Sequence, residues 1–175
     1  RRCCPVVPSD LTAPRPDGTR PGSRAVDRMT ESTVHDLRSA LRFLNGHVNL
    51  EAAAGRIHGL SLEAMRGLVG AMGEPQTDVR TVHVTGTNGK GSVSAMVSGL
   101  LVSAGLRVGG YFSPHVDTVR ERLTMDGALI AEEDFVDLVA DLERYEGVAP
   151  DQPSYFELLT AAALLWFSNE AVDAA

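Results

Sequence analysis

Apolar residues recur at helical spacing along most of the chain after about residue 30. An amphipathic helix is expected wherever they return every three or four positions. This pattern predicts helices at 33–44, 61–71, 91–104, 134–146 and 155–167. Runs of β-branched or alternating residues predict strands at 79–85 and 107–112, and a hairpin from Leu123 to Ile130 that turns at Asp126-Gly127.

The order of these elements predicts an α/β fold. Strand 79–85, helix 91–104 and strand 107–112 form a βαβ unit, which is right-handed and joins parallel strands of a covered sheet. We therefore expect a P-loop-type parallel sheet flanked by helices.

The ends of the predicted helices carry local signals. Thr33 is the expected N-cap of the first helix, and Gly46 ends it. Ser154 and Glu157 have the spacing of a capping box at the start of the last helix, and this structural role is the stronger interpretation of Glu157. The residues expected to face the core are Val34, Leu37, Leu41, Leu44, Leu62, Met65, Leu68, Val69, Phe135, Leu138, Val139 and Leu142.

Residues 1–28 differ in composition from the rest. They hold five prolines and six arginines with little apolar periodicity, which predicts a disordered tail before a domain over residues 29–175. No apolar stretch follows the arginines, so the tail is not a secretory signal. One interpretation is that the residues before Met29 are upstream translated sequence or a mis-assigned start. The alternative is a basic tail that contacts a partner.

Charge and composition narrow the classes of function. The net charge of −7 argues against a general nucleic-acid or membrane-surface binder, so an anionic substrate would need local positive charge. No apolar run approaches the roughly 20 residues of a membrane span. The two cysteines, Cys3 and Cys4, are adjacent and form no disulfide framework, which suits a cytoplasmic protein.

Candidate chemistry concentrates in the turn at residues 86–92, Gly-Thr-Asn-Gly-Lys-Gly-Ser. Its glycines let a phosphate approach the backbone, the N–H groups and dipole of the helix start favour an anion, and Lys90 adds a charge that suits a triphosphate. The strict phosphate-loop pattern fails, because Val84 stands where it requires glycine and Gly91 follows the lysine. A glycine-rich turn with a solvated lysine is the alternative.

Ser113-Pro114-His115 directly follows the second predicted strand. The carboxyl ends of parallel strands line the ligand crevice of an open α/β sheet, so we expect Ser113 on the same edge as the phosphate loop. Gly91 offers no side-chain oxygen for Mg²⁺, a cation that prefers oxygen ligands. Ser113 is therefore the expected metal ligand, and Ser92 competes with it. A plain strand-terminating turn is the alternative.

Residues 86–92 resemble the phosphate loop of the Mur ligase superfamily. The form with glycine after the lysine is similar to folylpolyglutamate synthase, which is often bifunctional with dihydrofolate synthase. The resemblance runs from about Val34 to the last residue. It continues in Tyr111-Phe112-Ser113-Pro114-His115, in Glu121-Arg122-Leu123 and in Ser154-Tyr155-Phe156-Glu157.

The resemblance implies an ATP- and Mg²⁺-dependent acid–amino-acid ligase of folate biosynthesis and one-carbon metabolism. Such an enzyme joins L-glutamate to folate, to dihydropteroate or to both through an acyl phosphate. The resemblance also implies an N-terminal fragment of the Mur ligase central domain, inactive alone, without the C-terminal part of that domain and the glutamate-binding domain. The complete enzyme is expected to be a monomer that acts on small molecules and binds neither nucleic acid nor membranes.

The resemblance also assigns roles to particular residues. Lys90 would be the catalytic residue that neutralises phosphate charge. The expected nucleotide-binding residues are Gly86, Thr87, Asn88, Gly89, Lys90, Gly91 and Ser92. The expected substrate-binding residues are Ser113, Pro114, His115, Arg122 and Phe156, with Gly59 and Leu60 as further pterin-site candidates. A surface salt bridge is the alternative for Glu121 and Arg122, and a core anchor is the alternative for Phe156.

Three other functions stay open: another Mur-type ligase acting on a cell-wall precursor, a small P-loop kinase, and a non-catalytic nucleotide-binding module. Gly91 and Ser113-Pro114-His115 argue against the first. An open sheet edge and an unmatched apolar helix at 155–167 predict poor solubility for the chain.

Overall fold

The computed structural model describes residues 32–49 and 61–175. The predicted tail at 1–28 and the pterin-site candidates Gly59 and Leu60 lie outside these residues. All five predicted helices are present, and the fold is α/β. The elements are α1 (Leu37–Asn45), α2 (Glu63–Ala71), η3 (Pro75–Thr77), α3 (Lys90–Ser103), β1 (Gly109–Tyr111), η4 (Val119–Arg122), β2 (Leu123–Met125), β3 (Ala128–Leu129), α4 (Glu132–Glu146) and α5 (Tyr155–Asn169).

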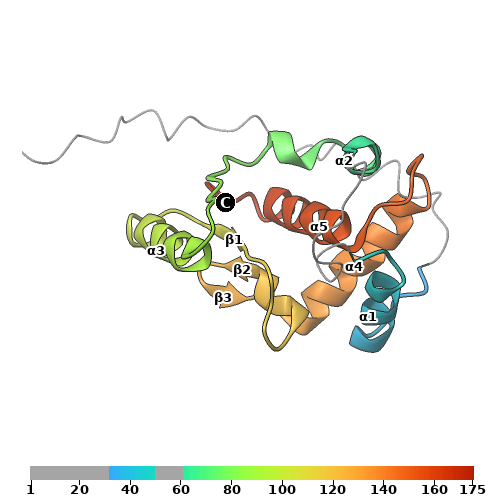
Figure 1. The fold of residues 1–175 in the computed structure, drawn as a ribbon, viewed down its shortest axis with the longest axis horizontal. Helices are drawn as coiled ribbons and strands as arrows, with labels where there is room; N and C mark the ends of the chain where they lie inside the picture. Colours follow the sequence, from blue (N-terminus) through green and yellow to red (C-terminus); the bar gives the residue numbers. More distant parts are fainter. Residues whose placement is uncertain (1–31, 50–60) are drawn as a thin grey trace, which may run out of the picture.

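Helix α5 lies at the centre of the core. Helices α1, α2 and α4 pack around it, and strand β1 also contacts it (Figure 1). The prediction that the helix at 155–167 lacks packing partners is therefore wrong, because these three helices bury most of its apolar side chains. None of the described helices is long and apolar enough to cross a membrane. The buried α5 residues are Tyr155, Leu158, Leu159, Ala161, Ala162, Ala163, Leu165 and Phe167.

The predicted core faces are largely confirmed. On α4 the apolar stripe Phe135, Leu138, Val139 and Leu142 is buried, as its spacing requires. Leu62 is the exception, with 63% of its surface exposed. It stands one residue before α2 begins, so the helical face that buries Leu68 does not extend to it.

The start of α1 differs from the prediction. The N-cap is Asp36, whose carboxylate accepts the Ser39 N–H at 2.6 Å within a capping box. Thr33 instead donates its N–H and its hydroxyl to the Glu143 carboxylate, at 2.8 and 2.6 Å. A contact between distant parts of the chain therefore takes Thr33 away from the local role that its position suggested. Gly46 does end the helix, as expected.

The described strands form one antiparallel sheet in the order β1-β2-β3. The predicted hairpin is confirmed: Met125 pairs with Ala128 across a turn in which Asp126 and Gly127 have φ of 52° and 83°. Positive φ at both turn residues matches the right-handed twist of the strands. The expected parallel pairing is limited to short contacts at the end of the chain.

Those contacts involve the last residues, 173–175. Val108 and Ala174 form a parallel bridge, while the Val82 N–H donates to the Ala175 carbonyl and the Ala175 N–H to the Arg80 carbonyl, both at 2.8 Å. Residues 173–175 therefore lie between β1 and the segment that leads to α3. The predicted strand at 79–85 and the predicted strand at 107–112 are thus separated by a third segment.

The prediction of a buried strand at 79–85 is wrong. No regular strand is assigned there, and Thr81, Val82 and Thr85 are exposed. The described residues give this segment a backbone partner on one side only, through Ala175. A single pair of hydrogen bonds neither extends a ladder nor covers the faces of a strand. Val82 is therefore 53% exposed, although Val79 at the start of the segment is buried.

Gly109 marks a close approach between β1 and α5, and alanine there should destabilise the protein. A Cβ would lie 2.5–2.8 Å from three ring atoms of Phe167, a side chain that is only 2% exposed. We expect Gly109→Ala to lower the free energy of unfolding by about 1–3 kcal/mol, the usual cost of overpacking. Urea titration followed by circular dichroism measures it.

Gly99 on α3 is the matched control, since a Cβ there meets nothing within 4 Å. Gly99→Ala should be neutral or slightly stabilising, because alanine favours a helix over glycine. Equal unfolding midpoints for the two variants would contradict the close packing of Gly109 on Phe167.

Candidate functional site

The glycine-rich turn leads directly into α3. Gly89 is the N-cap residue with φ of 78°, a left-handed value that glycine adopts without strain. The first helical hydrogen bond runs from the Val93 N–H to the Gly89 carbonyl, at 2.9 Å. The N–H groups of the first turn have no carbonyl acceptor inside a helix, and a Cβ at Gly91 would meet nothing within 4 Å. The loop therefore leaves both donors and space for an anion.

Lys90 lies over this loop with an exposed side chain. Its Nζ donates to the Gly86 carbonyl at 2.6 Å and reaches the Thr87 carbonyl at 3.4 Å. The ammonium group is thus beside the N–H donors at the helix start, and an incoming phosphate could replace the carbonyl acceptors. Lys90 therefore places a positive charge on the loop that leads into α3.

A cavity of about 400 Å³ lies beside the loop. It is open on one side and is lined by residues 81–84, one face of α3, β1 with the residues that follow it, and one face of α5. Four predicted site residues line it: Lys90, Gly91, Ser113 and Phe156. The other predicted site residues do not line it: Gly86, Thr87, Asn88, Gly89, Ser92, Pro114, His115 and Arg122.

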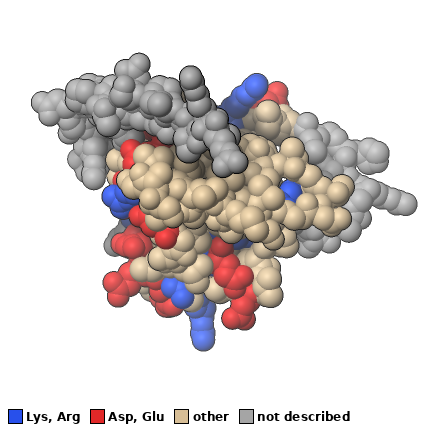
Figure 2. Space-filling model, turned by 90° about the vertical axis from the view of Figure 1, so that its left-hand side faces the viewer, with Lys and Arg blue, Asp and Glu red and all other residues tan. Residues whose placement is uncertain are grey.

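The glycine-rich loop and the residues after β1 border the same cavity. Ser113 comes two residues after β1 and borders the same cavity as Lys90, so the expected proximity of these two residues is confirmed. Ser92 is exposed on the first turn of α3, outside the cavity lining. The face of the molecule that carries α3 is largely without charged side chains, while acidic side chains gather below it (Figure 2).

Glu121 shapes the turn that follows Ser113. Its carboxylate accepts N–H groups from Val116 at 2.9 Å, Asp117 at 3.0 Å and Thr118 at 2.8 Å. The bonds from Val116 and Thr118 are the main reason that the pKa of Glu121 falls below its usual value, so the carboxylate is ionised at neutral pH.

Arg122 is buried, with 2% of its surface exposed. Its Nε donates to His115 Nδ1 at 2.9 Å, and its guanidinium carbon lies 5.8 Å from the centre of the Tyr155 ring. The alternative of a surface salt bridge between Glu121 and Arg122 is therefore wrong. Glu121 holds backbone donors, and Arg122 lies inside the protein.

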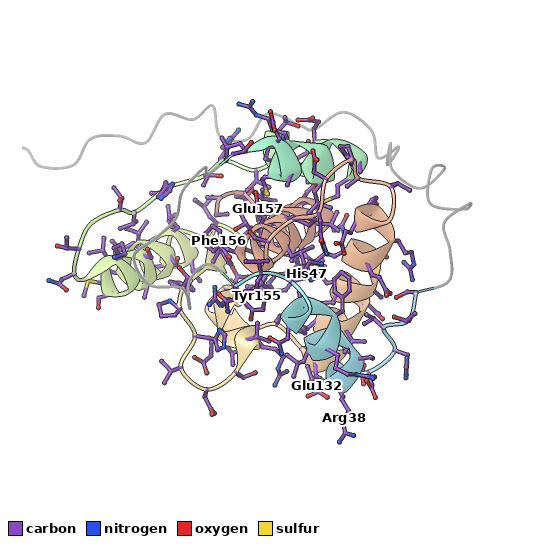
Figure 3. All side chains as sticks on the ribbon, turned by 45° about the vertical axis from the view of Figure 1, so that its right-hand side comes forward. Arg38, His47, Glu132, Tyr155, Phe156 and Glu157 are labelled. Carbon is purple, nitrogen blue, oxygen red and sulfur yellow. The ribbon has the colours of Figure 1, made fainter. Side chains whose placement is uncertain are left out.

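Phe156 is on the first turn of α5, next to Tyr155 and Glu157 (Figure 3). It is 39% exposed and its ring centre lies 6.4 Å from that of Tyr111, so it is not the core anchor of the alternative interpretation. Glu157 forms the predicted capping box, accepting the Ser154 N–H at 2.8 Å. The cavity wall thus offers an aromatic ring, while the acid next to it stabilises the helix start.

Sequence reasoning missed several polar cavity residues. Thr160 donates a hydrogen bond to the Phe156 carbonyl at 2.8 Å, and its hydroxyl lies 3.3 Å from that of Tyr111. Ser94 and Ser98 face the same cavity from α3. Helical spacing could have found them, because residues four apart share a face. Among the described residues, no cluster of three or more His, Cys, Asp or Glu could hold a metal ion.

Comparisons with known proteins agree with this geometry. No protein-family model matches the chain. A probable bifunctional folylpolyglutamate synthase/dihydropteroate synthase of Haloferax volcanii is 41% identical over 116 residues, covering 65% of this chain and 14% of that protein. The dihydrofolate synthase/folylpolyglutamate synthase of Bacillus subtilis is 37% identical over 112 residues, covering 62% of this chain and 26% of that protein.

Solved structures of folylpolyglutamate synthases also match the chain. Folylpolyglutamate synthase from Thermotoga maritima matches with a TM-score of 0.67 and 39% identity, over 79% of this chain and 31% of that one. An FPGS–AMPPCP–folate complex matches with a TM-score of 0.71 and 28% identity, over 81% of this chain and 34% of that one.

The fold is therefore the α/β fold of the Mur-type ligases. Within that class, the chain is related to a part of the folylpolyglutamate synthases and dihydrofolate synthases. It spans between 14% and 26% of the length of the two curated relatives described above.

Proposed function

We propose that this chain carries nucleotide- and folate-binding residues of an ATP-dependent ligase. The enzyme joins L-glutamate to folate, to dihydropteroate or to both, in folate biosynthesis. One observation carries the proposal: Lys90 of the phosphate loop and Phe156 of α5 border the same cavity. A phosphate-binding element and an aromatic platform thus meet around a single space.

The proposed reaction has two steps. A carboxylate oxygen of the folate substrate attacks the γ-phosphorus of ATP, and ADP leaves from an acyl phosphate. The amine of glutamate then attacks the acyl carbon, loses a proton and displaces inorganic phosphate, so that an amide forms. Stabilising charge and positioning the reactants are the main tasks of the protein in such a transfer.

The nucleotide side of the cavity suits these tasks. Lys90 would exchange its loop carbonyl partners for β- and γ-phosphate oxygens, while the N–H groups from Thr87 to Ser92 would surround the phosphates. Bound Mg²⁺ would neutralise phosphate charge, and it usually keeps water and phosphate ligands besides one or two from protein. The Ser113 hydroxyl, which borders the same cavity as Lys90, would be its protein ligand.

The folate side of the cavity is aromatic. Phe156 and Tyr111 present rings to a space that a pterin ring could enter, and aromatic rings favour offset stacking on one another. The homologous complex with AMPPCP and folate supports this pair of ligands. We further propose that the enzyme acts as a monomer in the cytoplasm, where ATP is available.

Steady-state assays of the complete gene product test the proposal. We expect ADP release only when ATP, glutamate and a folate or dihydropteroate substrate are all present, with a glutamylated product seen by mass spectrometry. ADP release without glutamate consumption would indicate a kinase. Binding of AMPPCP without turnover would indicate a nucleotide-binding module, and turnover with a cell-wall precursor would indicate another Mur-type ligase.

A further inference from the structure

The turn between β1 and η4, residues 113–118, is held from two sides by neighbouring side chains. On one side, the Glu121 carboxylate gathers three consecutive backbone N–H groups, those of Val116, Asp117 and Thr118. Val116 is 95% exposed, so no packing fixes this part of the turn. The carboxylate is the feature that gives it a defined shape.

On the other side, Arg122 ties three parts of the molecule together. Its carbonyl accepts the Phe112 N–H at 2.9 Å, its Nε donates to His115, and its guanidinium lies over the Tyr155 ring. Tyr155 is 5% exposed, so the stacked pair is inside the protein. A buried cation is costly to displace from its partners, which makes this connection rigid.

Of the residues that Arg122 holds, Phe112 lines the cavity itself, and His115 and Tyr155 are close in sequence to residues that line it. Ser113 stands between Phe112 and His115, and Phe156 follows Tyr155 on the first turn of α5 (Figure 3). Arg122 itself is not part of the cavity lining. Within the part of the chain that the structure describes, Arg122 therefore reaches the cavity through the residues that it holds.

The geometry points to Glu121 and Arg122 as positioning residues that fix the 113–118 turn and so set the place of Ser113 relative to Phe156 across the cavity. This inference rests on the proposed function, in which Ser113 serves the nucleotide and Phe156 serves the folate. A shift of about 1 Å in such an arrangement can cost about 100-fold in rate. The two side chains act without touching either ligand.

Kinetics of Arg122 variants test the first half of the inference. We expect Arg122→Met to lower kcat/KM for folate by about 100-fold, while AMPPCP affinity measured without Mg²⁺ stays near that of the wild type. Arg122→Lys keeps the buried charge and so guards against a folding failure. The kcat/KM of Arg122→Lys for folate should stay nearly as low as that of Arg122→Met. Lysine lacks the planar guanidinium group, which bonds His115 and lies over Tyr155 at the same time. Arg120→Met, also on η4, is the matched control and should keep wild-type kinetics.

A double variant separates positioning from direct contact. If Arg122 acts through His115, then His115→Ala combined with Arg122→Met should be no worse than the more damaging single change. Losses that multiply would overturn the link through His115, because they would mean that Arg122 and His115 act independently of one another. A normal folate kcat/KM in Arg122→Met would overturn it as well.

Hydrogen exchange tests the role of Glu121 without any assay of activity. We expect Glu121→Gln to speed exchange of the Val116, Asp117 and Thr118 amides, and Glu132→Gln on α4 to leave them unchanged. If these amides exchange freely in the wild type, or do not respond to Glu121→Gln, the inference fails. A wild type without glutamate-dependent ADP release would instead refute the proposed function, and the exchange result would still stand.

Discussion

Replacing Lys90 with alanine is expected to lower kcat of the complete gene product by at least about 10²–10³-fold, the usual loss when a preorganised charge-stabilising group is removed. The reason is local charge. Lys90 borders the cavity beside the N–H groups of the α3 start, in a protein whose net charge is −7. Its removal leaves the developing charge on the γ-phosphate without a cation from the loop. Turnover is followed by ADP release at saturating ATP, glutamate and folate.

The same change should leave the fold intact. The Lys90 side chain is exposed, and its Nζ bonds only to carbonyls of its own loop among the described residues. The thermal midpoint of Lys90→Ala should therefore match that of the wild type. Lys90→Arg keeps the charge with a different shape and should recover part of the turnover. Near-normal activity of Lys90→Ala would remove Lys90 from the phosphate site.

Replacing Ser113 with alanine is expected to raise the Mg²⁺ concentration needed for half-maximal activity by at least about tenfold, a typical effect of disturbing the surroundings of a metal. Gly91 provides no hydroxyl after the lysine, and Ser113 is the predicted metal ligand that borders the same cavity as Lys90. The measurement is a Mg²⁺ titration of ADP release at fixed ATP. Binding of metal-free AMPPCP should stay near that of the wild type, because the hydroxyl acts on the cation.

Ser92 supplies the matched control, since it is also a serine beside the loop but lies outside the cavity lining. Ser92→Ala should leave the Mg²⁺ requirement unchanged. Any effect of this variant should be limited to the affinity for the nucleotide. If Ser92→Ala raises the Mg²⁺ requirement and Ser113→Ala does not, the metal role belongs to Ser92. The two variants thus decide between the two hydroxyls that the sequence offered.

Features that depend on a few neighbouring residues could be predicted from the sequence. The hairpin follows from Asp126-Gly127, and the start of α5 follows from the capping box of Ser154 and Glu157. The buried face of α4 follows from helical spacing alone. The glycine-rich turn that leads into α3 was also found locally, because the glycines, the lysine and the helix start are consecutive.

Features that depend on distant partners could not be predicted in this way. Thr33 had a local capping signal, but the Glu143 carboxylate offered it a stronger set of bonds. The segment at 79–85 had strand composition, but strand structure requires neighbours on its edges. Nothing local indicated that Arg122 would be buried against Tyr155 while Glu121 stayed with the backbone. The partners of these two charged side chains are decided by tertiary packing.

Lys90 is the only lysine in the chain, and its exposed Nζ rests on two carbonyls of the loop. Its amine is therefore the single side-chain target for amine-reactive reagents across all 175 residues. Chemical labelling can thus report on the phosphate loop without any engineered residue. The extent of modification at Lys90, read by peptide mapping so that the α-amino group is counted separately, should fall when an anion occupies the loop.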